Sequence, residues 1–305
     1  MSPARGTVVA IALLLAACAA TGCGLGPGAD LGGASLTVTR DYGAAPLPVP
    51  RRDSVSESDT VMRVLERNAE IETRYGGGFV QSIDGLEAEE RFGRSSDWFF
   101  YVDGVESTVG AADYPLRGGE AIWWDYRDWS AAMRVPAVVG SWPQPFLGGY
   151  DGHRHPVAVV CLGGDAACGV ARGALGDTGV ELGPASAKGA IRVLVGPWQR
   201  VQADPAAAQI EDGPQASGVF ARFERRGGGW TLAGLGVDGK TARMLGPAAG
   251  LVAATRRYDA PPTWIVTGVD RAGVAAAAGL LDSADLRDRY AVATEGGRET
   301  PLPIQ

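Results

Sequence analysis

The chain has 305 residues, of which 46% are hydrophobic and 21% charged, and its formal net charge is −7 at pH 7. This acidic balance argues against nucleic-acid binding, which needs a concentrated basic surface that no segment of the sequence provides. The length is sufficient for two domains.

The N-terminal segment predicts the leader of a bacterial lipoprotein. Arg5 precedes the apolar run VVAIALLLAA, which is too short to span a bilayer as a mature helix and is typical of a signal peptide. LAAC, ending at Cys18, and ATGC, ending at Cys23, both resemble the lipobox, whose cysteine receives acyl chains. Residues 1–22 are therefore predicted to be a signal peptide, with Cys18 or Cys23 anchoring the protein to the outer face of the cytoplasmic membrane. An ordinary secretory signal is the alternative.

The next segments predict a tether and a first domain. Residues 23–35 are rich in glycine and are expected to be flexible, and residues 36–130 are expected to form an α+β domain. ASLTVTRDYG alternates as a strand does, and SDTVMRVLERNAEI indicates an amphipathic helix with Ser58 or Asp59 as its cap. FVQSIDGL, DWFFYVDGVE and EAIWWDYRD predict strands that join the same mixed sheet, with the helix packed on it.

The rest of the chain predicts a connector and a second domain. Residues 131–170 form a Pro- and Gly-rich connector that contains Cys161 and Cys168. In an exported protein, two cysteines separated by LGGDAA predict a disulfide, with a metal site as the alternative. Residues 171–305 are predicted to be an α/β domain, because PTWIVTGVDRAGVAAAAGLLDSADLRDRYAVAT indicates strand, helix, short helix and strand. Asp270 is expected to cap the first of these helices.

Two neighbouring strands carry more aromatic side chains than one core face needs. Alternation places one purely apolar set on the face beneath the predicted helix of residues 59–70: Trp98, Phe100 and Trp124. The opposite face mixes aromatic and charged side chains, as a ligand-facing surface would: Phe99, Tyr101, Trp123, Asp125 and Arg127. The alternative is that the second domain or another protein covers this face.

The mixed face is the candidate ligand-binding site. Phe99, Tyr101 and Trp123 are predicted to form a platform that is exposed or lines a cleft, with Asp125 and Arg127 supplying polar contacts. On this hypothesis, truncation of Trp124 destabilises the fold, whereas truncation of Trp123 leaves folding nearly unchanged and weakens ligand retention.

The same strands carry a family resemblance. FVQSIDGL, followed by DWFFYVDGVESTVGAADYPLRGGEAIWWDYRD, resembles the small β-rich domain that ends transcobalamin and intrinsic factor, over about residues 36–130. The resemblance implies a transcobalamin C-terminal-like, β-grasp-like fold and the binding of a large, partly apolar molecule, with a corrinoid such as cobalamin as the best candidate. Tyr114, in the GAADY segment, completes the candidate ligand-binding set. The helical barrel that accompanies this domain in transcobalamin has no counterpart here, and residues 171–305 resemble no family.

Signals for catalysis are absent from the sequence. It contains no G-x-S-x-G or H-E-x-x-H pattern, so no catalytic residue is assigned and an enzyme is not expected. His153 and His155 in DGHRHP are a weak alternative metal site, and no cofactor is expected beyond a bound corrinoid as ligand.

Together these features predict a lipid-anchored extracytoplasmic binding protein for a large, partly apolar small molecule, with a membrane transporter as a partner that could receive it. The alternative is a non-catalytic structural or protein-interaction lipoprotein of the cell envelope.

Overall fold

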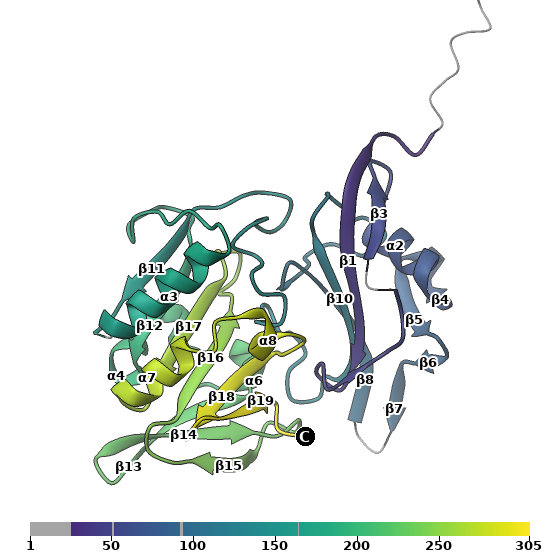
Figure 1. The fold of residues 1–305 in the computed structure, drawn as a ribbon. Coiled ribbons are helices and arrows are strands. Elements are labelled where there is room, and N and C mark those ends of the chain that lie inside the picture. The colour runs from purple at the N-terminus through teal and green to yellow at the C-terminus, as the bar shows by residue number, and fades with distance from the viewer. Residues whose placement is uncertain (1–25, 51, 92–93, 164) are drawn as a thin grey trace, which may run out of the picture.

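The structure is a computed structural model that describes residues 26–305 apart from residues 51, 92, 93 and 164. The predicted signal peptide and both lipobox cysteines lie outside the described residues. The described chain forms two α/β units side by side, the first in purple and blue and the second in teal to yellow (Figure 1). Among the described residues, no helix has the length and apolar character needed to cross a membrane.

The first domain is built on a seven-stranded mixed sheet, as predicted. At its centre β1 (Asp30–Arg40) runs parallel to β10 (Ala121–Asp128), with Val38 opposite Trp124. β10 pairs on its other side with β8 (Arg94–Val102) in antiparallel register, with Trp123 opposite Tyr101. The remaining strands of this sheet are β2 (Ala45–Pro46), β3 (Arg52–Ser56), β7 (Glu89–Arg91) and β9 (Val105–Glu106).

One helix covers one face of this sheet. α2 (Val61–Asn68) buries an apolar stripe against β1, β8 and β10, as the amphipathic pattern predicts. Thr60 is its cap, since the Thr60 hydroxyl accepts from the Arg63 amide, so the predicted caps Ser58 and Asp59 are wrong. The carboxylate of Asp59 instead accepts from Ser56 and pairs with Arg67. A small sheet packs beside α2: β4 (Ile71–Arg74), β5 (Phe79–Ile83) and β6 (Leu86–Glu87).

The second domain has three layers around a six-stranded mixed sheet. Its strand order is β11-β12-β17-β16-β18-β19, with the first three strands parallel and the others antiparallel. The strands are β11 (Val157–Cys161), β12 (Ile191–Pro197), β16 (Gly250–Thr255), β17 (Thr263–Gly268), β18 (Ala291–Glu295) and β19 (Arg298–Leu302). Helices α3 (Asp165–Asp177) and α7 (Arg271–Ala278) cover one face.

A three-stranded antiparallel sheet and short helices cover the other face. The strands are β13 (Ala221–Arg226), β14 (Gly229–Leu235) and β15 (Thr241–Leu245). The short helices of this domain are α4 (Trp198–Val201), α5 (Pro205–Ala208), α6 (Pro214–Ser217) and α8 (Ser283–Leu286).

Glycines let α7 lie directly against the sheet. A side chain added at Gly268 of β17 would come within 2.5 Å of the α7 backbone, and one at Gly250 of β16 would come within 2.2 Å of the Gly273 carbonyl oxygen. Asp270 caps α7 by accepting from the Gly273 amide at 2.9 Å, as predicted. The predicted order of strand, helix, short helix and strand is confirmed, and β16 lies between β17 and β18.

Two predicted boundaries need correction. β1 begins at Asp30 and pairs with β3 from its first residue, so residues 30–35 are part of the sheet rather than of a tether. β11 and α3 belong to the second domain, which therefore begins at Val157 rather than at residue 171. The true connector is residues 129–156, and its Trp142 and Phe146 pack in the core of the second domain.

Candidate functional site

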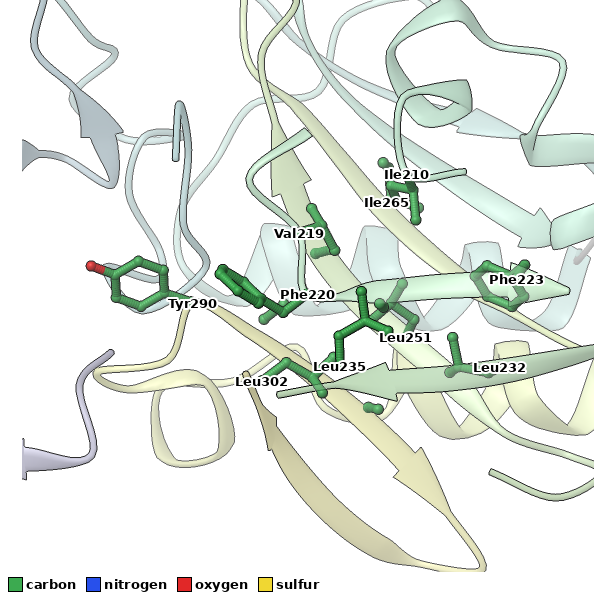
Figure 2. Close-up of a cluster of buried hydrophobic side chains, with 14 of the residues drawn as sticks. Ile210, Val219, Phe220, Phe223, Leu232, Leu235, Leu251, Ile265, Tyr290 and Leu302 are labelled. Carbon is green, nitrogen blue, oxygen red and sulfur yellow. The ribbon is translucent and has the colours of Figure 1, made fainter. Parts of the chain in front are cut away.

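The second domain covers the mixed aromatic face of the first. Tyr101 is 0% exposed and Trp123 is 2% exposed, because Tyr290 and Phe220 of the second domain close over this face. The rings of Trp123 and Tyr290 meet edge-on with centroids 5.3 Å apart. Figure 2 shows Tyr290 and Phe220 at one end of the buried cluster of the second domain. The predicted open platform is therefore wrong, and the alternative, a cover supplied by the second domain, is what the structure shows.

A buried carboxylate holds the two domains together. Asp125 accepts hydrogen bonds from the Thr39 hydroxyl at 2.5 Å, the Gly43 amide at 3.0 Å and the Tyr290 hydroxyl at 2.9 Å. Burial raises the pKa of Asp125 to about 6. Trp123 joins the same network, since its indole Nε1 donates to the Thr39 hydroxyl at 2.8 Å. The charge that suggested an exposed surface is thus satisfied inside the protein.

Arg127 is also structural. It is 0% exposed, and its guanidinium donates to the backbone carbonyl oxygens of Ala132 at 2.7 Å and Met133 at 3.0 Å. The same group lies 3.7 Å from the ring centroid of Phe99. Arg127 therefore fixes the start of the connector against β10.

Tyr114 lies on the other side of the sheet. It is 5% exposed and packs in the core beneath α2, with its hydroxyl 3.5 Å from a carboxylate oxygen of Glu120. The six residues of the predicted ligand-binding set therefore do not surround one cavity. Trp123 borders a cleft between the domains, and Phe99 borders a different cleft on the α2 side.

The cleft on the α2 side is the best candidate for an apolar ligand. It has a volume of about 240 Å³, and its lining includes five aromatic residues, Met62 and Glu106. Trp98 and Trp124 are buried there, as predicted, whereas Phe100 is only half-buried and departs from the prediction. Phe79 is half-buried as well. The indole Nε1 of Trp124 has no hydrogen-bond partner among the residues that the structure describes.

A glycine-rich hairpin forms the rim of this cleft. The β4–β5 turn carries Tyr75, which is 87% exposed and contacts Phe79 edge-on with ring centroids 6.1 Å apart. Tyr75, Gly76 and Gly77 all have positive φ, which explains the run of glycines. Sequence reasoning assigned no function to this turn. An aromatic residue placed directly before three glycines was the available signal.

Residues 58–128 match the family model of a domain of unknown function, DUF4430. The match covers less than a quarter of the chain and contains α2, the hairpin rim and the aromatic lining of the cleft. No curated protein matches the chain.

The two histidines lie outside the DUF4430 region, and their side chains have different surroundings. The His155 ring stacks on Tyr150 with centroids 4.1 Å apart, and His153 is exposed. Nowhere in the described part of the chain do three or more His, Cys, Asp or Glu side chains come together as metal ligands. The weak alternative of a metal site therefore lacks a ligand set.

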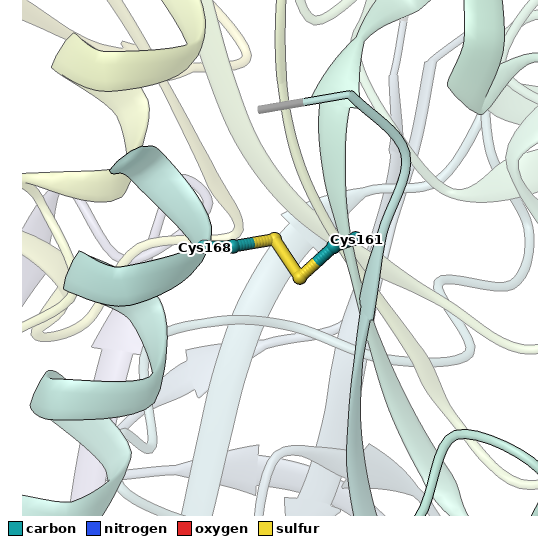
Figure 3. The surroundings of a disulfide bond; sticks show 2 residues. All are labelled: Cys161 and Cys168. Carbon is teal, nitrogen blue, oxygen red and sulfur yellow. A yellow bond between two sulfur atoms is a disulfide. The ribbon is translucent and has the colours of Figure 1, made fainter. Parts of the chain in front are cut away.

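The predicted disulfide is confirmed. Cys161 at the end of β11 is bonded to Cys168 in α3, with Cα atoms 5.9 Å apart (Figure 3). The bond ties the edge strand of the second domain to the helix that covers it.

Proposed function

We propose that the protein is a lipid-anchored, extracytoplasmic, non-catalytic binding protein whose DUF4430 region contacts the apolar part of a small-molecule ligand. The observation that carries the proposal is the cleft on the α2 side, where Phe79 and Phe100 stay half-exposed around buried indoles. On the other face of the same sheet, Tyr101 and Trp123 are buried by the second domain. Aromatic side chains left open around a concave site are typical of ligand contact.

The size of the cleft limits how much of a ligand it can enclose. Its volume of about 240 Å³ is below the roughly 300–1,000 Å³ of sites that enclose a drug-sized ligand. It therefore accommodates one edge or substituent of a larger molecule, with Tyr75 of the hairpin rim as an additional contact. The resemblance to the terminal domain of transcobalamin makes a corrinoid the first ligand to test, and delivery to a membrane transporter is part of the proposal.

Titration with cyanocobalamin tests the cleft directly, alongside native mass spectrometry of ligands retained on purification. We expect the double variant Phe79→Ser/Phe100→Ser to bind at least about tenfold more weakly, since each buried aromatic contact contributes roughly 1.5–3 kcal/mol. Tyr258→Ser removes an 85% exposed aromatic ring in the second domain and serves as the control. Equal affinity in the double variant and the control, or no retained or titrated ligand at all, would reject the cleft as the site.

The lipid anchor has its own test. Replacing both Cys18 and Cys23 by Ser is expected to abolish palmitate incorporation and release the protein into the medium, because acylation would supply the membrane attachment. The two single replacements show which cysteine is acylated. Continued membrane association of the double variant without acylation would contradict the anchor.

The alternative function is an interaction lipoprotein. It is supported by the covered aromatic face and by a second cleft, of about 540 Å³, which is bordered by the 58% exposed Met133 and the 85% exposed Tyr258. Cross-linking from position 258 to a specific envelope protein, together with an empty cleft in native mass spectrometry, favours this function.

A further inference from the structure

A groove follows the junction between the two domains, on the side where Trp123 reaches the edge of the interface. Two clefts, of about 420 and 330 Å³, make up this groove. Both are lined by Gly119 and Gln144, so they adjoin one another. The first domain supplies one wall and the connector with the segment after α8 supplies the other.

Four arginines line the groove in two pairs. Arg52 and Arg287 border the larger cleft, and Arg117 and Arg154 border the smaller one. All four are exposed, and their guanidinium groups form no ion pair or hydrogen bond with another described residue. Other arginines of the chain do pair with carboxylates: Arg67, Arg134, Arg192, Arg226 and Arg256.

The carboxyl groups of the groove offset only part of this charge, including that of Arg117, which interacts electrostatically with Glu120. Asp103 and Glu120 line the smaller cleft but are 2% and 7% exposed. Burial raises the pKa of Asp103 to about 8 and raises the pKa of Glu120 above its ordinary value, so Asp103 is mostly protonated at neutral pH. Asp288 is the third carboxyl group along the groove. A chain of net charge −7 thus gathers four guanidinium groups in one concave strip.

We propose that this groove is a second ligand site, which binds an organic anion with at least two carboxylate or phosphate groups. The planar fork of a guanidinium group matches the paired oxygens of a carboxylate or a phosphate. The ligand is expected to carry two anionic groups because each of the two adjoining clefts holds one pair of arginines. Trp123 and Trp142 in the larger cleft provide apolar surface for the carbon skeleton of the ligand. This site is separate from the cleft on the α2 side in both place and chemistry.

Isothermal titration of the full-length protein with citrate and with pyrophosphate, at low ionic strength, tests the groove. The test variant is Arg117→Gln/Arg287→Gln, which removes one guanidinium group from each cleft. The control variant is Arg172→Gln/Arg271→Gln, because these exposed arginines of α3 and α7 lie outside the groove and their replacement changes the net charge equally. We expect wild type and control to bind with Kd values within about twofold, and the test variant to bind roughly tenfold more weakly for each guanidinium group removed.

Tighter binding of citrate would indicate a carboxylate site, and tighter binding of pyrophosphate would indicate a phosphate site. Arg117→Lys/Arg287→Lys keeps the positive charges but lacks the planar guanidinium groups. Its Kd is expected to lie between those of the wild type and of the Arg117→Gln/Arg287→Gln variant. Phe79→Ser/Phe100→Ser should leave anion binding unchanged, which separates this site from the proposed function. Thermal melting confirms that each variant is folded. Equal weakening of the test and control variants, or no saturable binding of either probe to the folded wild type, would overturn the proposal.

Discussion

Replacing Trp123 by Ala is expected to lower the free energy of unfolding by about 3–5 kcal/mol, the range for a large buried aromatic side chain. The residue is 2% exposed, packs on Tyr101 and Tyr290, and donates to the Thr39 hydroxyl. The substitution removes this packing and leaves a cavity between the domains. Denaturant unfolding followed by circular dichroism measures the effect. This expectation reverses the one drawn from sequence, in which Trp123 contributed little to folding.

Two comparisons control this measurement. Trp124→Ala, on the opposite face of the same strand, should destabilise by a similar amount, since Trp124 is 3% exposed in the core beneath α2. Tyr258→Ala should change the free energy of unfolding by no more than about 0.5 kcal/mol, because its side chain is 85% exposed. If Trp123→Ala behaved like Tyr258→Ala, the domains would not be packed together in solution as described.

The stability of the protein is expected to fall as the pH rises from about 4 to 8. Asp103 is the first residue of the turn between β8 and β9, and burial raises the pKa of its carboxyl group from 3.8 to about 8. Between these two pKa values the folded chain holds a proton that the unfolded chain has released, so the free energy of unfolding decreases with pH. A tenfold difference in proton affinity corresponds to about 1.4 kcal/mol, which gives a decrease of up to about 5 kcal/mol across this range. Asp125, with a pKa raised to about 6, adds to the decrease below pH 6.

Asp103→Asn isolates this effect. The amide is neutral at every pH and its oxygen can still accept from the Ala121 amide, which donates to Asp103 at 2.8 Å. Unfolding free energies measured at pH 4.5 and pH 8 should therefore differ much less in the variant, which should be the more stable protein at pH 8. Asp59 and Asp204 have lowered pKa values and contribute stability that disappears only at more acidic pH, outside this range. A wild-type stability that is flat between pH 4.5 and 8 would contradict the expected burial of Asp103.

Local sequence patterns predicted the first domain well because its core is built from regular alternation. Trp98 and Trp124 lie beneath the helix where their spacing places them, and the helix carries the predicted apolar stripe. The cover on the opposite face could not be predicted, because Phe220 and Tyr290 come from distant parts of the chain.

The charges on that face were misinterpreted for the same reason. Asp125 and Arg127 suggested contact with solvent, yet both side chains are buried. Asp125 accepts from Thr39, Gly43 and Tyr290. Arg127 donates to two connector carbonyls, while its Nε has no hydrogen-bond partner among the described residues. A charged side chain in an alternating strand looks the same whether water or protein solvates it. The groove between the domains could not be predicted from the sequence either, because its four arginines come from four separated segments.

The parallel pairing of β1 with β10 has a consequence for the folding of the chain during its synthesis. β1 leaves the ribosome long before β10, whose Tyr126 is the partner of Arg40. Until then the inner edge of β1 has no strand to pair with, so the first domain can close only after its last strand has emerged. A fragment limited to residues 58–128 would lack β1 altogether and would leave β10 as an open, aromatic edge prone to aggregation.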